Sequence, residues 1–242
     1  MKNAGLIFLA AVLVCLGTGC ASSGKTVLRT QREPIALVSV ASNWDINWKG
    51  EDSLDPDTVI GLAKRSLRKD PDLTFITNAE ELINTAEAVI REIMTGPAVI
   101  SLAEKDRVLF SQAYRNARIN KRRIIREEVK PDNYLFVDHR DKNFPSALAA
   151  ETGIQRTMYV DFNFTKFMAT GFAKMGTLRA EVEMAVQILD VSGKTIYKKT
   201  VTMGSSSTSK VSNGAYLQTE LLSLFEDTII DVCYELLDIL SD

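Results

Sequence analysis

The clearest constraint on this fold is an alternation of apolar and polar side chains between residues 178 and 188. Leu178, Ala180 and Val182 begin the apolar series, which Met184, Val186 and Ile188 continue, and Arg179, Glu181, Glu183 and Gln187 lie between them. This period of two predicts a strand with one buried face and one polar face. Turn residues at 190–193 precede a second run at 195–203, so the segment predicts an antiparallel hairpin.

The last part of the sequence predicts a long amphipathic helix that covers the buried face of this hairpin. Its apolar positions recur at helical spacing, at Leu217, Leu221, Leu224, Thr228, Val232 and Leu236. Cys233 shares a face with Ile229 and Leu236, which predicts a buried and unreactive thiol.

Upstream segments predict strands and helices in alternation. We expect strands at 35–41, 134–137 and 158–165, and helices at about 55–67, 78–93, 102–125 and 144–150, with Gly153 ending the last helix. This order predicts an α/β fold with a mixed sheet packed with helices, a central helical insertion at about 78–131, and a C-terminal hairpin followed by the long helix. We assign residues 34–242 to this single domain.

The amino terminus has the layout of a secretory signal peptide over residues 1–19. Lys2 supplies the positive start, residues 4–16 are apolar, and small residues precede Cys20. The apolar run is too short to cross a bilayer as a helix. Cleavage before Cys20 would leave an amino-terminal cysteine for lipid attachment, and residues 20–33 would form a tether. The alternative is an ordinary secreted protein cleaved near Ala21.

Composition excludes some classes of partner. The 29 basic residues balance the 31 acidic ones, so no overall positive field would attract nucleic acid. Cys15 lies in the leader and Cys20 is the acylation candidate, which leaves Cys233 alone in the folded part and predicts no intramolecular disulfide.

Residues 144–164 resemble a pattern found in several envelope lipoproteins. The helix with its Ala-Leu-Ala-Ala sequence, the Gly153-Ile154 turn and the following strand are similar to those of the TolB amino-terminal domain, the penicillin-binding-protein activators and the curli-secretion lipoproteins. The resemblance implies an envelope adaptor or secretion component rather than an enzyme. Ala21 and Ser22 after the cysteine imply the outer membrane, facing the periplasm, because enterobacterial lipoproteins retained at the inner membrane carry Asp there.

Candidate catalytic and metal-binding residues are few. His139 lies between Asp138 and Arg140, and a carboxylate beside it could orient the ring for proton transfer. A histidine at such a position is more commonly an ordinary surface residue of a loop. Residues 45–56 begin like a calcium loop, but Lys49 and Pro56 occupy positions that require oxygen ligands. The sequence therefore predicts no catalytic residue, metal site or cofactor.

Two segments are candidates for contact with a partner protein. Trp44 and Trp48 flank the polar loop after the first predicted strand, where they would either anchor a protein partner, a glycan or a lipid interface, or cap the edge of the core. A basic segment contains Arg115, Arg118, Lys121, Arg122, Arg123 and Arg126. This segment would meet anionic headgroups or a partner, or would simply be a solvated helix face paired with nearby glutamates.

These observations predict a non-enzymatic lipoprotein, anchored through diacylglycerol and acyl chains such as palmitate on Cys20, that acts as an adaptor for another envelope protein. The alternative is an envelope module that binds a lipid or small ligand beneath the insertion helices. The sequence makes no prediction of oligomeric state.

Overall fold

The computed structural model describes residues 33–49, 79–95, 101–172 and 175–241, which form a mixed sheet packed with helices. The leader, Cys20 and the helix expected at 55–67 lie outside the described residues. The described elements are β1 (Ala36–Ser42), β2 (Asn47–Trp48), α4 (Ala79–Thr95), α5 (Lys105–Leu109), α6 (Gln112–Arg115), α7 (Lys121–Ile125), α8 (Asn143–Thr152), β3 (Arg156–Phe172), β4 (Met175–Asp190), β5 (Thr195–Gly204), β6 (Ser209–Val211) and α9 (Gln218–Ser241).

The long β3–β4 hairpin forms the centre of the sheet. The strand order is β1-β3-β4-β5, in which β1 is parallel to β3 and the later strands are antiparallel. The short strand β2 also pairs with β3, further along it than β1, and β6 pairs with β4. The six apolar residues expected on one face of β4 are all buried. The predicted hairpin of residues 178–188 and 195–203, which is formed by β4 and β5, is confirmed, as is the buried face of β4.

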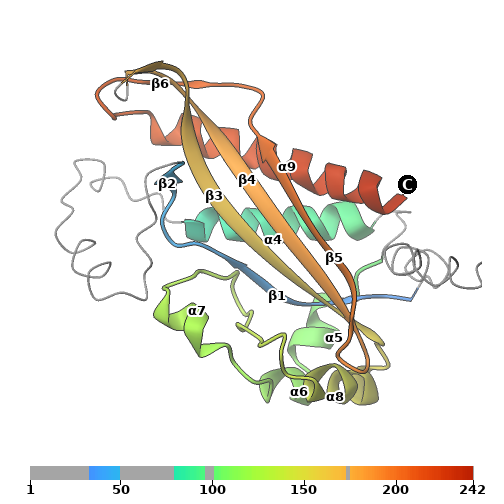
Figure 1. Ribbon diagram of the computed structural model, residues 1–242. Coiled ribbons are helices and arrows are strands. Elements are labelled where there is room, and N and C mark those ends of the chain that lie inside the picture. Colours follow the sequence, from blue (N-terminus) through green and yellow to red (C-terminus); the bar gives the residue numbers. More distant parts are fainter. Residues whose placement is uncertain (1–32, 50–78, 96–100, 173–174, 242) are drawn as a thin grey trace, which may run out of the picture.

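Two helices cover the buried face of this sheet. Figure 1 shows α4 and α9 together against it, with α5, α6 and α8 grouped near one end of the sheet and α7 apart from them. Phe164 on β3 meets Phe225 on α9 edge to face, with ring centroids 5.6 Å apart. Such aromatic contacts stabilise the fold beyond the burial of apolar area alone. The contact also confirms the expected position of the terminal helix across the sheet.

The opposite face of the sheet is polar and only partly covered, and we call it the open face. It carries Asn163 from β3, Glu183 from β4, and Thr200 and Thr202 from β5, all exposed. These residues occupy the polar positions of the alternation, because successive side chains of a strand point to opposite faces.

The single helix expected at 102–125 is wrong. The chain forms three short helices, because Ser111 accepts a hydrogen bond from the Tyr114 amide and Asn120 accepts one from the Arg122 amide, and each of these side chains starts a new helix. Ile119 between them pairs with Val137 as an isolated bridge. Side chains that cap an amide compete with a continuous helix, which explains the two breaks.

The strand expected at 134–137 is also wrong. The Leu135 amide donates to the Tyr114 hydroxyl at 2.8 Å, and the Phe136 carbonyl accepts from the Asn120 amide at 2.7 Å. The backbone of this segment therefore bonds to the insertion rather than to the sheet. By contrast, α8 ends as expected at Gly153, whose positive φ of 75° permits the left-handed cap.

A side chain bridges the gap between β1 and β2 along β3. Asn43 accepts from the Phe164 amide at 2.8 Å and donates to the Phe164 carbonyl at 2.9 Å, so its amide group replaces a strand residue where β1 has ended. The chain then rejoins β3 at Asn47, opposite Thr165.

Replacing Asn43 by Ala should lower the free energy of unfolding by about 2 kcal/mol, because both backbone groups of Phe164 lose their partner. Asn43→Asp should also destabilise, since a carboxylate cannot donate to the Phe164 carbonyl. Urea denaturation measures the change. Asn47→Ala, at an exposed site on the neighbouring strand, is the matched control, and equal losses in the two alanine variants would contradict this role for Asn43.

Candidate functional site

The first candidate segment, around the two tryptophans, forms part of the sheet edge. Trp48 belongs to β2 and is only 7% exposed. Trp44 is partly buried against the core, and its carbonyl accepts from the Ala79 amide at the start of α4. This is the geometry of the alternative in which the tryptophans cap the core edge.

Trp48 belongs to a compact aromatic group. Its ring lies edge to face with Tyr216, at 6.5 Å between centroids, and the buried Lys166 ammonium lies 5.2 Å from the Trp48 ring. Lys166 also donates to the Tyr216 hydroxyl at 2.7 Å. A cation over aromatic rings is held more strongly when desolvated, so this group fixes β2 to the segment before α9.

The second candidate segment, the basic one, is held to the sheet by Arg123. Its two terminal nitrogens reach the two oxygens of Asp161 on β3 at 2.6 and 2.8 Å, and one of them also reaches Glu128 at 3.0 Å. The Arg123 side chain is 14% exposed. Burial alone would lower the Arg123 pKa, but the two carboxylates outweigh it and raise the pKa, so this guanidinium remains charged.

The neighbouring side chains of α7 point into solvent. Ile124 is 56% and Ile125 67% exposed, although both are large and apolar. Lys121, Arg122 and Arg126 around them are exposed as well. We call Lys121, Arg122, Ile124, Ile125 and Arg126 the α7 surface.

The two remaining arginines of the basic segment are exposed and have local partners. The Arg118 Nε lies 3.2 Å from Asp138, and the Arg115 guanidinium lies 5.9 Å from the centre of the exposed Phe110 ring. Exposed pairs of this kind contribute little to stability.

The structure brings both candidate segments to the same margin of the sheet. The Ser42 amide and carbonyl exchange hydrogen bonds of 2.9 Å with Val129, directly after the basic segment, while Asn43 begins the loop that carries Trp44. Arg123 reaches β3 at Asp161, four positions before Thr165 opposite β2. The α7 surface and the tryptophan segment therefore flank one edge.

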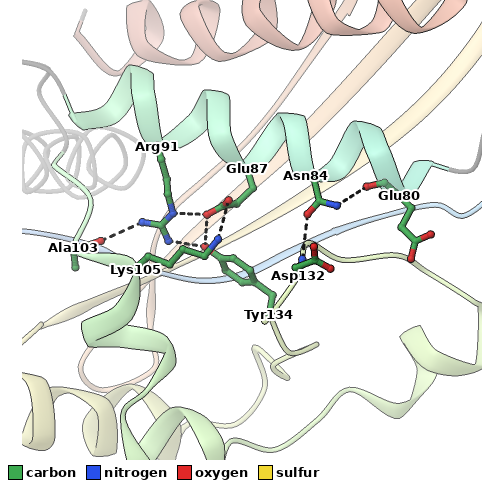
Figure 2. A network of polar contacts seen from close by, with 8 residues as sticks. All are labelled: Glu80, Asn84, Glu87, Arg91, Ala103, Lys105, Asp132 and Tyr134. Atoms are coloured by element: carbon green, nitrogen blue, oxygen red, sulfur yellow. Dashed lines mark hydrogen bonds and ion pairs between the residues drawn. The ribbon is translucent and has the colours of Figure 1, made fainter. Parts of the chain in front are cut away.

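A buried polar cluster joins α4 to the segments that carry Lys105 and Tyr134. Figure 2 shows the Glu87 carboxylate at its centre, paired with Arg91 and Lys105 and accepting from the Tyr134 hydroxyl at 2.9 Å. Burial alone would raise the Glu87 pKa, but these three partners outweigh it and hold the pKa below its ordinary value. Burial also raises the pKa of Tyr134, so its hydroxyl stays protonated and donates. This arrangement is that of a structural clamp.

This cluster was not predicted from the sequence, although a signal was present. Glu87 lies on the apolar face of α4 next to Ala86 and Ile90, and Arg91 follows at the i+4 position. A carboxylate on an apolar face is buried only when it is paired, so its position already indicates a hidden cation. Asp161, which receives Arg123 on β3, had no comparable signal.

The candidate reactive groups have environments that suppress reactivity. Burial lowers the His139 pKa, and the ring lies edge to face with Tyr159 at 6.2 Å. Asp138 accepts from the Arg140 amide and pairs with Arg118. Cys233 is buried, which raises its pKa to about 12, as expected for an inert thiol.

Among the described residues, no three histidine, cysteine or acidic side chains gather closely enough to hold a metal ion. The helices in the described part of the chain are too short or too polar to cross a membrane.

Comparisons with known proteins give little. No protein-family model matches the chain, and no curated protein matches it. Among solved structures, the LpoB C-terminal domain from Salmonella enterica aligns with a TM-score of 0.29 and 9% identity, over 75% of this chain and 92% of that one. A likeness at this level establishes neither a shared fold nor a shared function.

Replacing Glu87 by Gln should lower the free energy of unfolding at pH 7 by roughly 2–3 kcal/mol, because Arg91 and Lys105 lose their counter-charge in a mostly buried site. The folded-state pKa of Glu87 is lowered, so the stabilisation is complete above the unfolded pKa of about 4.3 and disappears as pH falls through the folded value.

Denaturation curves from pH 7 down to pH 3 measure this difference. Wild type and Glu87→Gln should converge at the acid end. Glu92→Gln, on the exposed side of the same helix, serves as control and should change stability by less than about 0.5 kcal/mol. A loss that is constant across the range would show that the carboxylate charge is not the stabilising feature.

Proposed function

We propose that this protein is a non-enzymatic, lipid-anchored adaptor of the bacterial cell envelope that binds a partner protein through the α7 surface. The observation that carries the proposal is the exposure of Ile124 and Ile125 among three cations on a short helix that Arg123 fixes to the sheet. Exposed apolar groups that form a contiguous patch with a charged border are typical of protein interfaces.

Rigid attachment favours recognition by this surface. The bonds from Arg123 to Asp161 and Glu128 hold α7 in one position, so little conformational freedom is lost when a partner binds. The isoleucines would fill an apolar recess on the partner, and Lys121, Arg122 and Arg126 would face acidic groups around it.

The location of the adaptor follows from the amino-terminal sequence. We propose that residues 1–19 are removed, that Cys20 receives the lipid, and that residues up to Glu33 tether the domain. Each methylene of a buried acyl chain contributes about 0.8 kcal/mol, so two or three long chains would make detachment rare. The residues after Cys20 support an outer-membrane location facing the periplasm.

Partner binding can be tested by photo-cross-linking in the source cell. A photoreactive amino acid at position 125 should give a discrete adduct with one envelope protein. The same amino acid at position 230, an exposed isoleucine site on α9, should not give that adduct. Identical adducts from both positions, or none from position 125, would contradict partner binding through the α7 surface.

Affinity for the captured partner should fall by about 10- to 100-fold in the double variant Ile124→Ser, Ile125→Ser, because two apolar contacts are lost. Calorimetric titration with the purified partner measures the change. Ile230→Ser is the matched control, and circular dichroism should show unchanged folding in both variants.

Lipid attachment should depend on one side chain. Growth with radioactive palmitate should label the wild-type chain, and Cys20→Ala should abolish the label and release the protein from the membrane fraction. Label that persists in Cys20→Ala would contradict acylation at this residue. An unlabelled but shortened wild-type chain would support the ordinary secreted protein instead.

A further inference from the structure

The two margins of the sheet differ in how their backbone groups are used. At the β1 margin, Ile35 exchanges hydrogen bonds of 2.8 Å with Ser101 and Ala103, and Ser42 exchanges bonds with Val129. At the other margin lies β5, which Figure 1 shows at the side of the sheet away from β1. Within the described residues, the backbone hydrogen bonds of β5 go to β4 alone. In the part of the chain that the structure describes, one edge is therefore filled and the other is available.

The hydrogen-bond pattern identifies the available groups on β5. The Ser205 amide donates to the Ala180 carbonyl at 2.8 Å, one step beyond the pair of Gly204 with Glu181. Hydrogen-bonded and non-bonded pairs alternate along an antiparallel ladder. The N–H and C=O groups of Lys198, Thr200 and Thr202 therefore point away from β4, towards the free edge.

The side chains of the same three residues are also accessible. They pair across β4 with Gln187, Ala185 and Glu183, so they lie on the open face, and all three are exposed. An added strand would thus find both a row of backbone partners and a set of exposed side chains.

The charge of this edge indicates what kind of strand it would accept. Between residues 191 and 219 the chain has four lysines, at 194, 198, 199 and 210, and no acidic residue. Pairing of two β5 edges from two copies of the chain would bring two basic strands together, which is unfavourable, and edge lysines are a common device against such pairing. An acidic strand would be attracted.

We propose that the outer edge of β5 accepts an extended acidic segment of a partner protein as an additional strand of the sheet. Backbone bonds to Lys198, Thr200 and Thr202 would supply affinity, and the lysines would select acidic side chains. This interaction uses neither the α7 surface nor the lipid anchor, so it stands or falls separately from the proposed function.

The test uses the full-length protein and two synthetic peptides of eight residues. One alternates valine or threonine with glutamate, and the other has lysine in place of every glutamate. Fluorescence anisotropy should show binding of the acidic peptide that weakens at least 10-fold between low and high salt, and at least 10-fold weaker binding of the basic peptide. Hydrogen exchange should show the acidic peptide slowing exchange at Lys198, Thr200 and Thr202.

Two variants separate edge pairing from simple charge attraction. Thr200→Pro removes an outward N–H without removing a bond to β4, as edge strands tolerate, and should lower affinity for the acidic peptide at least 10-fold. Thr200→Val, which keeps the N–H, should bind like wild type. Where Thr200→Pro does not fold, the double variant Lys198→Glu, Lys199→Glu decides, because it should prefer the basic peptide.

Several results would overturn the proposal. These are equal binding of both peptides, an unchanged preference in Lys198→Glu, Lys199→Glu, or slowed exchange at residues outside β5. Sedimentation that shows a dimer of the wild type and a monomer of Thr200→Pro would assign the edge to a second copy of the chain instead. Cross-linking from position 125 should be unaffected by all these variants.

Discussion

Burial of one face of the β3–β4 hairpin beneath α9 and α4 is the constraint on which the remaining structure depends. Phe164 and Phe225 meet within this layer, and the alternating residues of β4 complete it. Because side chains alternate along a strand, the same burial places Asp161, Glu183 and Thr200 on the other face. The polar open face and the attachment point for Arg123 are therefore consequences of how the core is packed.

The sequence predicts those parts of the fold in which one periodic signal dominates. Residues 178–188 keep an apolar residue at every second position, and α9 repeats apolar residues at helical spacing, so both were placed correctly. Residues 102–125 also favour a helix locally, but Ser111 and Asn120 cap new helices once Tyr114 and Ile119 find partners near residues 135–137. Contacts between distant segments decided the structure there, and no local pattern reports them.

The same limit applies to the candidate site. Six basic residues between 115 and 126 look equivalent in the sequence, yet Arg123 is mostly buried between two carboxylates while Arg122 is exposed one position away. The difference arises from Asp161, 38 residues further along the chain, which only the folded sheet brings into reach. Trp48 is the opposite case, a residue considered for partner binding that is instead buried at the edge of the core. It packs there against Lys166 and Tyr216.

The buried thiol of Cys233 reports on the packing of α9 against the sheet through its rate of alkylation. Its thiol lies beneath the helix with a pKa of about 12, so alkylating reagents meet almost no thiolate while the fold is intact. Modification then requires the helix to separate from the sheet, and its rate measures how often that separation occurs. The opening of the core can thus be measured from the alkylation rate of a native residue, without any engineered label.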